Sequence, residues 1–290
     1  MNFQEIIRAL ENYWMRNGCL IEIPYDVEMG AGTLHPSTFL RALGPEPWHA
    51  AYVQPARRPS DSRYGESPYR LTRHFQYQVI FKPAPDDAQE IYLESLRTIG
   101  IDPRHHDIKF MEDIWESHTL GASGIGWQVW LDGLEITQFT YFQTAGGLEL
   151  QPVSLELTYG LERIAMVIQD VDSYKEIHWN DDVTYGDIYH RGEYEWGRYY
   201  LELSDPTLSR ALFDIHEREA LNLLENEEVY PAYDLALKCS HIVHMLDARG
   251  ALSISQRERY IARVRTMAHR CATGYLNQRE KLGFPLLKEK

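Results

Sequence analysis

The stretch WQVWLDGLEITQFTYFQ, residues 127–143, carries the clearest structural signal in the sequence. Two runs rich in β-branched and aromatic residues, 127–131 and 134–143, flank the dipeptide Asp132-Gly133. An Asp-Gly pair between two such runs is typical of a two-residue hairpin turn. The stretch therefore predicts two antiparallel strands joined by a tight turn.

Further strand-like runs lie on both sides of this hairpin, at residues 20–25, 50–54, 74–81 and 151–157. Helical patterns lie at residues 86–100 and 159–168, and another begins at the N-terminus. There Asn2 and Glu5 have the spacing of a capping box, and Gly18 is a natural end. The pattern predicts an α+β fold, an antiparallel sheet with flanking helices, over residues 1–170.

The second part of the chain, residues 171–290, has a different texture. An irregular aromatic stretch runs from Tyr174 to Tyr200, and three helices are expected after it. They begin at residues 206, 231 and 253, and glycines at 250 and 283 end the last two. We therefore expect an α+β domain at 1–170 and a mostly helical C-terminal domain at 171–290.

Composition excludes several classes of protein. A hydrophobic content of 44% over 290 residues is too high for a disordered chain, and no apolar run is long enough to span a membrane. The three cysteines are far apart, which favours a reducing cytoplasm. The net charge of −14 repels a polyanion, so a nucleic-acid substrate would need a local basic patch or another subunit.

The stretch PARRPSDSRYGESPYRLTR, residues 55–73, concentrates arginine in this acidic chain. Its arginines are Arg57, Arg58, Arg63, Arg70 and Arg73. An exposed polar loop is one interpretation. The other is a polyphosphate site, because the loop joins two predicted strands and guanidinium groups form forked hydrogen bonds to phosphate.

A second motif, GLERIAM at residues 160–166, has little meaning alone, since many amphipathic helices begin this way. Combined with the arginines, it supplies Arg163, which with Phe75 could enclose a purine ring. Glu135 and Gln138 on the hairpin add oxygen ligands for Mg²⁺. The set suits adenylation, in which a carboxylate attacks the α-phosphorus of ATP and pyrophosphate leaves.

The order of these features resembles the three signature motifs of class II aminoacyl-tRNA synthetases. Longer stretches closely resemble the α-subunit family of bacterial glycyl-tRNA synthetases: EMGAGTLHPSTFLRALGPEPW (28–48), AAYVQPARRP (50–59), TLGASGIGWQVWLDGLEITQFTYFQ (119–143), LTYGLERIAMVIQ (157–169) and MLDARGALSISQRERYIARVRTMA (245–268). The resemblance implies a class II antiparallel-sheet catalytic domain followed by helices. It also implies a glycine–tRNA ligase that converts ATP, glycine and tRNA to glycyl-tRNA, AMP and pyrophosphate.

The resemblance also implies roles for individual residues. Those expected to bind ATP are Arg57, Arg58, Arg70, Phe75 and Arg163, the first three of them catalytic. Those expected at Mg²⁺ are Glu135 and Gln138, and those expected at glycine are Glu156, Thr158, Trp115, Gln76 and Thr33. Gln54 stands where a related enzyme has its motif arginine, which leaves open which neighbouring arginine holds the α-phosphate. For Trp115, burial in the core is an equal alternative.

The family resemblance implies partners as well: an α–α homodimer and two larger β subunits that carry most contacts to tRNA(Gly). Glycine activation needs no general base, and no residue stands out as the base for transfer. His35, His105 and His106 are poorer choices than groups of the substrates, and the last two are expected in a surface turn. The alternatives are a ligase that adenylates a small acid without tRNA, and a catalytically inactive paralogue with a binding or regulatory role.

Overall fold

A computed structural model describes residues 1–287. A seven-stranded sheet with the order β1-β2-β3-β7-β6-β5-β4 forms its centre. The strands are β1 Leu20–Ile21, β2 Trp48–Arg57, β3 Arg73–Lys82, β4 Ile108–Ser117, β5 Ala122–Leu131, β6 Leu134–Ala145 and β7 Leu148–Gly160. The β1–β2 pair is parallel and every other pair is antiparallel, which confirms the predicted α+β class.

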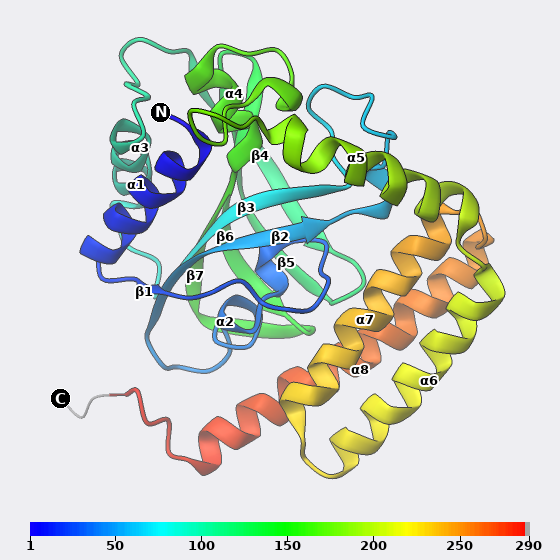
Figure 1. Cartoon of the computed structure of the whole chain (residues 1–290). Coiled ribbons are helices and arrows are strands. Elements are labelled where there is room, and N and C mark those ends of the chain that lie inside the picture. The colour runs from blue at the N-terminus through cyan, green and yellow to red at the C-terminus, as the bar shows by residue number, and fades with distance from the viewer. Residues whose placement is uncertain (288–290) are drawn as a thin grey trace.

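Eight α-helices surround this sheet within residues 1–287 (Figure 1). They are α1 Phe3–Arg16, α2 Pro36–Phe39, α3 Ala88–Thr98, α4 Leu161–Gln169, α5 Tyr185–Arg198, α6 Pro206–Glu225, α7 Val229–Ala248 and α8 Ile254–Lys281. Short 3₁₀ turns lie at Gly32–Leu34, Pro59–Asp61 and Tyr174–Glu176, and a π-helical turn at Tyr199–Leu203 follows α5.

The sheet separates two hydrophobic cores. Alternate residues of a strand point to opposite faces, so Val79 joins one core and its neighbour Ile80 joins the other. Helices α1, α3 and α4 cover the first face, and α7 and α8 pack on the second, with α6 beside them (Figure 1). The cavity described below lies on the second face.

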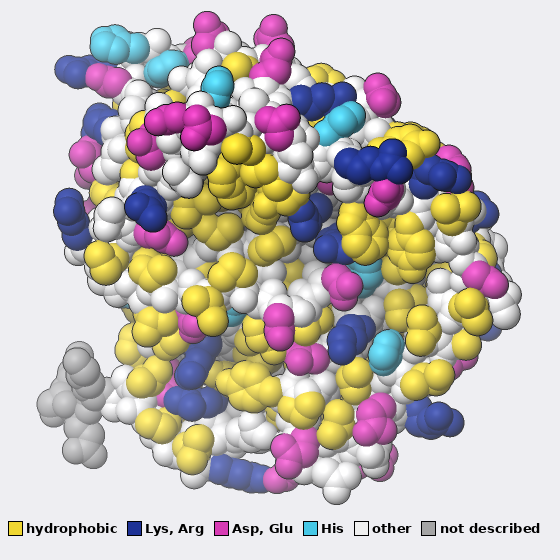
Figure 2. All heavy atoms as spheres, viewed as in Figure 1, with side chains coloured by type: hydrophobic (Ala, Val, Ile, Leu, Met, Phe, Trp, Pro, Cys, Tyr) yellow, Lys and Arg dark blue, Asp and Glu magenta, His cyan; other side chains and the backbone are white. Residues whose placement is uncertain are grey.

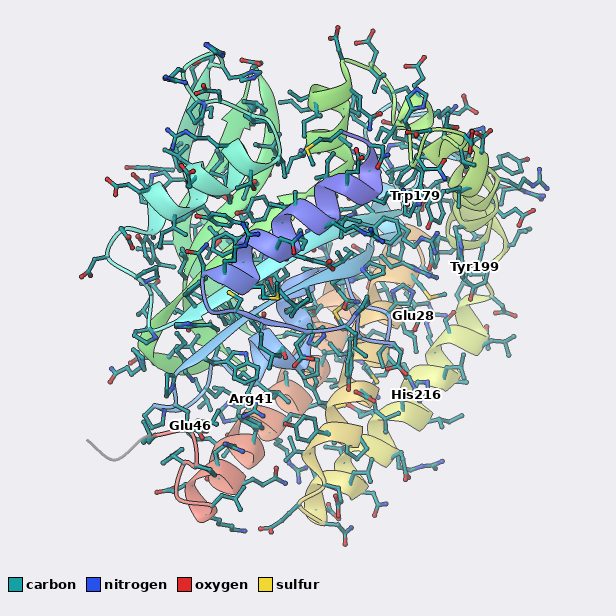
Figure 3. All side chains as sticks on the ribbon, turned by 60° about the vertical axis from the view of Figure 1, so that its left-hand side comes forward. Glu28, Arg41, Glu46, Trp179, Tyr199 and His216 are labelled. Atoms are coloured by element: carbon teal, nitrogen blue, oxygen red, sulfur yellow. The ribbon has the colours of Figure 1, made fainter. Side chains whose placement is uncertain are left out.

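The local signals act as expected at the hairpin and at the N-terminus. Asp132 and Gly133 have φ angles of 50° and 89°, the two positive values that a type I′ turn needs. Asn2 and Glu5 form the predicted capping box of α1. At the start of α1, Phe3 stacks on Trp179, which is labelled in Figure 3, with ring centroids 4.7 Å apart. Both predictions are confirmed.

The C-terminal end of α8 is fixed to the sheet domain. Arg279 donates two hydrogen bonds, of 2.7 and 2.6 Å, to the carboxylate of Glu46, which lies beside this helix in Figure 3. Glu46 also accepts a bond from the backbone of Leu286. Lys82 lies nearby, with its ammonium bonded to the carbonyls of Arg41, Leu43 and Gly44.

Three sequence expectations need correction. The aromatic stretch 174–200 is not irregular, because residues 185–198 form α5, whose Thr184–Asp187 capping box and aromatic packing outweigh modest helix propensity. Strand β4 was not expected, since this edge strand mixes charged residues with its apolar ones. The predicted strand 20–25 is reduced to β1, residues 20–21. The three C-terminal helices are confirmed as α6, α7 and α8.

The domain boundary at residue 170 stays a prediction. Helix α5 lies beyond it in sequence and nevertheless packs against β3, through Tyr189 and Phe75. No helix within residues 1–287 combines the length and apolar character needed to cross a membrane.

Candidate active site

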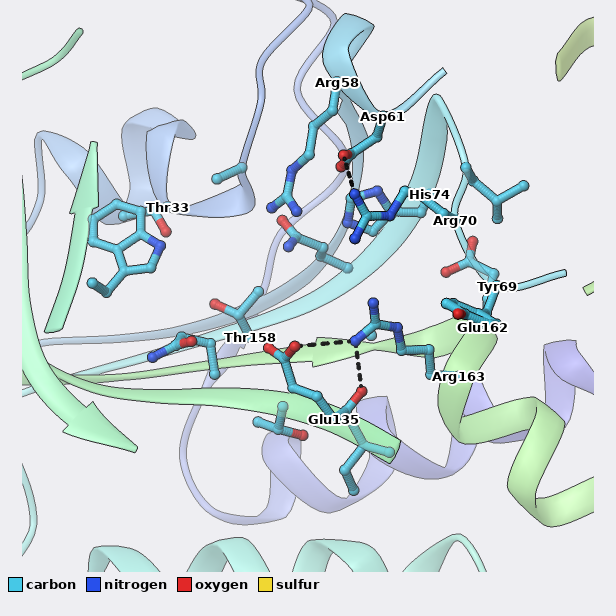
Figure 4. Close-up of a pocket in the computed structure, with 18 residues that line it drawn as sticks. Thr33, Arg58, Asp61, Tyr69, Arg70, His74, Glu135, Thr158, Glu162 and Arg163 are labelled. Atoms are coloured by element: carbon cyan, nitrogen blue, oxygen red, sulfur yellow. Dashed lines mark hydrogen bonds and ion pairs between the residues drawn. The ribbon is translucent and has the colours of Figure 1, made fainter. Parts of the chain in front are cut away.

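A cavity of about 330 Å³ opens on the second face of the sheet (Figure 4). Its base is formed by β3, β6 and β7, where Gln78 is paired with Thr158 and Thr158 with Gln138. Directly paired residues in a sheet point to the same face, so this register gathers polar side chains at one place. The loop between β2 and β3 and the turn at 32–34 form the walls.

One end of the cavity is cationic, with three guanidinium groups labelled in Figure 4: Arg58, Arg70 and Arg163. Arg58 is held by a 2.8 Å bond from Nε to the carbonyl of Gly30. Arg70 pairs with Asp61 at 3.4 Å, and Arg163 pairs with the Glu135 carboxylate at 3.2 Å. These arginines come from two separate elements, the arginine-rich loop and the first turn of α4.

The ring of His74 lies between these cations. Burial, and after it the positive charges of Arg58 and Arg163, hold its pKa well below the ordinary value of 6.5. The imidazole is therefore neutral at physiological pH, so it offers a flat face without adding positive charge.

The other end of the cavity is rich in hydrogen-bond acceptors. Thr33 and the amide of Gln78 both donate to the buried carboxylate of Glu156. Thr158 donates to the carbonyl oxygen of Gln78 at 2.9 Å. Burial raises the pKa of Glu156 to about 7, although both hydrogen bonds oppose this. A threonine hydroxyl has one proton and two lone pairs, so Thr33 and Thr158, having donated, are left as acceptors.

Close backbone approach fixes the turn that carries Thr33. The backbone N–H of Gly32 donates to Gln76 at 2.7 Å. A Cβ at Gly32 would lie 2.7 Å from the side-chain oxygen of Gln78, closer than van der Waals contact allows. Any other residue here would have to displace the Gln78 side chain, whereas glycine allows the 32–34 turn to lie directly on β3.

The structure brings most of the predicted site residues together. Those that line the cavity are Thr33, Arg58, Arg70, Gln76, Trp115, Glu135, Gln138, Thr158 and Arg163. Three predicted residues do not line it: Arg57, Phe75 and Glu156. Trp115 lines the cavity and also packs at the edge of the core, so its contact with glycine stays a prediction.

The side chain of Arg57 points elsewhere, with its guanidinium 4.3 Å from the ring centre of Trp196 on α5. Gln54 is occupied too: it bonds to the backbone N–H and carbonyl of Tyr25, at 2.8 and 3.2 Å. Of the arginines expected to bind the phosphates, Arg58 and Arg70 are the two from this loop that reach the cavity.

Phe75 does not fit the expected position against adenine. It follows His74 and precedes Gln76, both of which line the cavity, so strand alternation sends it to the opposite face. There its ring packs against Phe3 and Tyr189, with centroids 6.1 and 5.6 Å away. The ring that faces the cavity at this point of β3 is His74.

Glu156 lies beneath the cavity rather than in its wall, and it is only 2% exposed. Thr33 and Gln78 cover its carboxylate. The hydroxyl of Thr33 therefore lies between the cavity and this carboxylate, and the role of Glu156 in glycine binding stays a prediction. Gln78 and His74 were not among the predicted site residues, although polar and apolar residues alternate over 74–79 and this pattern places both on the face of Gln76.

The metal prediction can be tested against the donor atoms present. Within residues 1–287 no cluster of three or more His, Cys, Asp or Glu side chains could hold a metal alone. Glu135 supplies one carboxylate and Gln138 one amide, whose buried Nε2 has no partner within the described residues. Mg²⁺ in nucleotide sites is held by one or two carboxylates plus phosphate oxygens and waters. These residues therefore fit a metal that arrives with a nucleotide.

Comparison with protein families places the chain in one of them. A model of the glycyl-tRNA synthetase alpha subunit family matches residues 3–280. The chain belongs to this family. Membership confirms the predicted class II aminoacyl-tRNA synthetase fold, and it supports an aminoacyl-tRNA synthetase activity, which uses ATP as a substrate.

Two solved structures are also similar, both of pyrrolysyl-tRNA synthetase from Desulfitobacterium hafniense. Each is 12% identical and covers 63% of this chain, with TM-scores of 0.44 and 0.45. The matches cover 72% and 75% of those chains.

Proposed function

We propose that this protein activates glycine with ATP to form glycyl-adenylate and, with a β subunit, transfers the glycyl group to tRNA(Gly). The observation that supports the proposal is the division of one cavity into a cationic end and an acceptor-rich end. An amino acid and ATP together need both: cations for the phosphates, and acceptors for the ammonium group.

At the cationic end, Arg58 and Arg70 bind the phosphates and withdraw charge from the α-phosphorus as the carboxylate attacks. The carboxylate oxygen of glycine forms the new P–O bond, and the bond to the β-phosphate breaks to release pyrophosphate. Arg163 covers one face of adenine, and His74 takes the place that the sequence assigned to Phe75. Mg²⁺, held by Glu135 and Gln138, neutralises phosphate charge when bound.

At the other end, the free lone pairs of Thr33 and Thr158 accept the ammonium protons of glycine. The Glu156 carboxylate beneath them supplies the negative charge. Trp115 and Gln76 narrow the space around Cα. An added methyl group would overpack such a site at a cost of roughly 1–3 kcal/mol, which favours glycine over alanine.

Transfer to tRNA requires a larger assembly. The family implies a β partner. We propose that two β subunits join an α–α homodimer and carry most of the tRNA contacts, in the cytoplasm. The net charge of −14 supports this division of labour. On the face in Figure 2, Lys and Arg side chains lie in small groups separated by acidic and hydrophobic ones.

His105 and His106 lie in the turn before β4, outside the cavity lining.

Amino-acid-dependent ATP–pyrophosphate exchange tests the proposal, with each standard amino acid supplied in turn to the purified chain, alone and with its β subunit. Exchange with glycine alone is the expected result. Exchange with none, even with β present, contradicts it, and ATP binding without exchange favours the inactive paralogue. Glycine-dependent exchange without charging of tRNA, in the complete assembly, favours a ligase that acts on a small acid.

A further inference from the structure

The start of β3 lacks a neighbouring strand on one side. Strand β7 ends at Gly160, which is paired with Gln76, so β3 residues before Gln76 extend past the end of β7. On the other side, β2 stays paired as far as Arg73. Buried backbone N–H groups need acceptors, so those that face the missing strand must find them elsewhere.

Two buried carboxylates take the place of the missing strand. Glu193 on α5 accepts bonds from the backbone N–H groups of Thr72 and Arg73, at 2.7 and 3.1 Å. Glu162 on α4 accepts one from Phe75 at 2.7 Å. Glu162 belongs to the GLER motif, whereas Glu193 lies in the aromatic stretch 174–200, outside the motifs that carry the predicted site residues. It is 3% exposed and does not line the cavity.

The peptide group that Glu193 holds is connected directly to the arginine-rich loop. The carbonyl of Thr72 accepts a 2.7 Å bond from the backbone N–H of Arg58. The hydroxyl of Thr72 donates to Ser62, within the loop, at 2.9 Å. Arg70 is two residues before Thr72, and His74 is two residues after it. The Glu193 carboxylate therefore fixes the backbone segment from which Arg70 and His74 project and to which the backbone of Arg58 is bonded.

A second contact shows that α5 and β3 pack closely here. The guanidinium of Arg73 lies 4.5 Å from the ring centre of Tyr189, one turn before Glu193 on α5. Helix α5, which carries Glu193, therefore packs against β3, the strand to which the Glu193 carboxylate is hydrogen-bonded.

We propose that Glu193 is a positioning residue for the nucleotide: it holds the base of the arginine-rich loop so that Arg58, Arg70 and His74 face the cavity. The inference rests on the proposed function, in which this cavity binds ATP. Glu193 touches no substrate, and it acts through the backbone of Thr72 and Arg73.

Glu193→Ala tests the proposal, with Glu195→Ala as the matched control on the same helix. Glu195 is exposed, and among residues 1–287 its carboxylate pairs only with Arg191, at 2.8 Å. Glu193→Ala removes the two hydrogen bonds that the backbone N–H groups of Thr72 and Arg73 donate to a charged carboxylate. Glu195→Ala removes no hydrogen bond to the arginine-rich loop. We expect the Kd for ATP, measured by calorimetry, to rise roughly tenfold to a hundredfold for Glu193→Ala. Glu195→Ala should stay within about twofold.

Three further readouts separate positioning from general loss of stability. The KM for ATP in the exchange assay should rise while the KM for glycine changes less than about threefold, because Thr33 and Thr158 are held by other contacts. Glu193→Gln keeps an acceptor oxygen and should restore part of the affinity. Hydrogen exchange of the Thr72 and Arg73 amides should quicken in both variants, while that of β5 and β6 stays unchanged.

An ATP affinity unchanged in folded Glu193→Ala would overturn the proposal, and so would equal rises in the KM for ATP and glycine with a lowered Tm. If the alanine variant does not fold, the glutamine variant decides by the same measurements. Failure of the proposed function gives a different result, because the wild-type protein would then show no glycine-dependent exchange. The calorimetric comparison of ATP binding would still test the positioning role of Glu193.

Discussion

Replacing Glu156 by glutamine removes a buried negative charge from beneath the cavity and keeps the shape of the side chain. Thr33 and Gln78 donate to this carboxylate. A glutamine carbonyl oxygen can accept from both. The change therefore removes the charge and little else. The charge is expected to lower the stability of the fold and to favour the binding of glycine.

The magnitude follows from the pKa. Burial raises the pKa of Glu156 from its ordinary value of 4.5 to about 7. A change of this size corresponds to about 3 kcal/mol. The folded state holds this proton more tightly than the unfolded state, so the contribution to stability is present below pH 4.5 and is lost as pH rises to 7. Above pH 7 the ionised group destabilises the fold.

Urea unfolding of both proteins at pH 5 and pH 8 measures this effect. We expect Glu156→Gln to match wild type within about 1 kcal/mol at pH 5 and to be more stable by up to about 3 kcal/mol at pH 8. Burial also raises the pKa of Glu162 to about 7. This second group stays in both proteins, so the variant should lose only part of the pH dependence. Glu149→Gln, an exposed change on the same strand β7, is the control.

Glycine binding should change in the opposite direction. At pH 8 the variant lacks the charge that attracts the ammonium group, so the KM for glycine in the exchange assay should rise at least roughly tenfold. The KM for ATP should stay within about twofold. Equal pH dependence of stability in both proteins would contradict the inference that ionised Glu156 destabilises the fold. An unaltered KM for glycine would show that Glu156 takes no part in recognising the amino acid.

Further variants test other parts of the site. Arg163→Ala should raise the Kd for ATP by more than roughly tenfold, measured by calorimetry, because stacking and a nearby charge are both lost; an unchanged value contradicts the role of Arg163. Phe75→Leu should lower stability by about 1 kcal/mol and leave the KM for ATP within twofold, whereas His74→Ala should raise that KM. The reverse pattern would restore Phe75 to the nucleotide site. Gly32→Ala should slow exchange by displacing the 32–34 turn, and normal kinetics would contradict this.

The sequence predicts the parts of the fold whose signals are local. The Asp132-Gly133 turn, the capping box at Asn2 and the helices that end at glycines depend on a few neighbouring residues, and all are present. The edge strand β4 was missed because an edge strand has one open side and alternates less clearly. Helix α5 was missed because its aromatic residues form a helix through tertiary packing.

Where residue type alone indicates chemistry, the sequence was sufficient to select residues that the structure places at the cavity, and their roles stay predictions. Arginines near a predicted strand end indicate an anion site whichever face they occupy, and Arg58, Arg70 and Arg163 all reach the cavity. The placement of Phe75 needed the strand alternation: polar and apolar residues alternate from His74 to Val79, which puts Phe75 on the face opposite His74 and Gln76. Family resemblance supplied the role of Phe75 without this geometric check.

The carboxylates Glu156, Glu162 and Glu193 were the hardest to interpret, because a glutamate is expected to face solvent. Here all three are buried, and burial raises the pKa of each. The three positions have one feature in common, which is that each carboxylate accepts a hydrogen bond from a residue at or next to the cavity lining. Glu156 accepts from the hydroxyl of Thr33, and the other two accept from backbone N–H groups. Such charges reduce the stability of the isolated fold, and local rules are most often broken where a site must be held in shape. Burial raises the pKa of Glu156 and of Glu162 to about 7, so both are ionised at pH 8 and protonated at pH 5. A ligand with a cationic group beside them should therefore raise the Tm more at pH 8 than at pH 5.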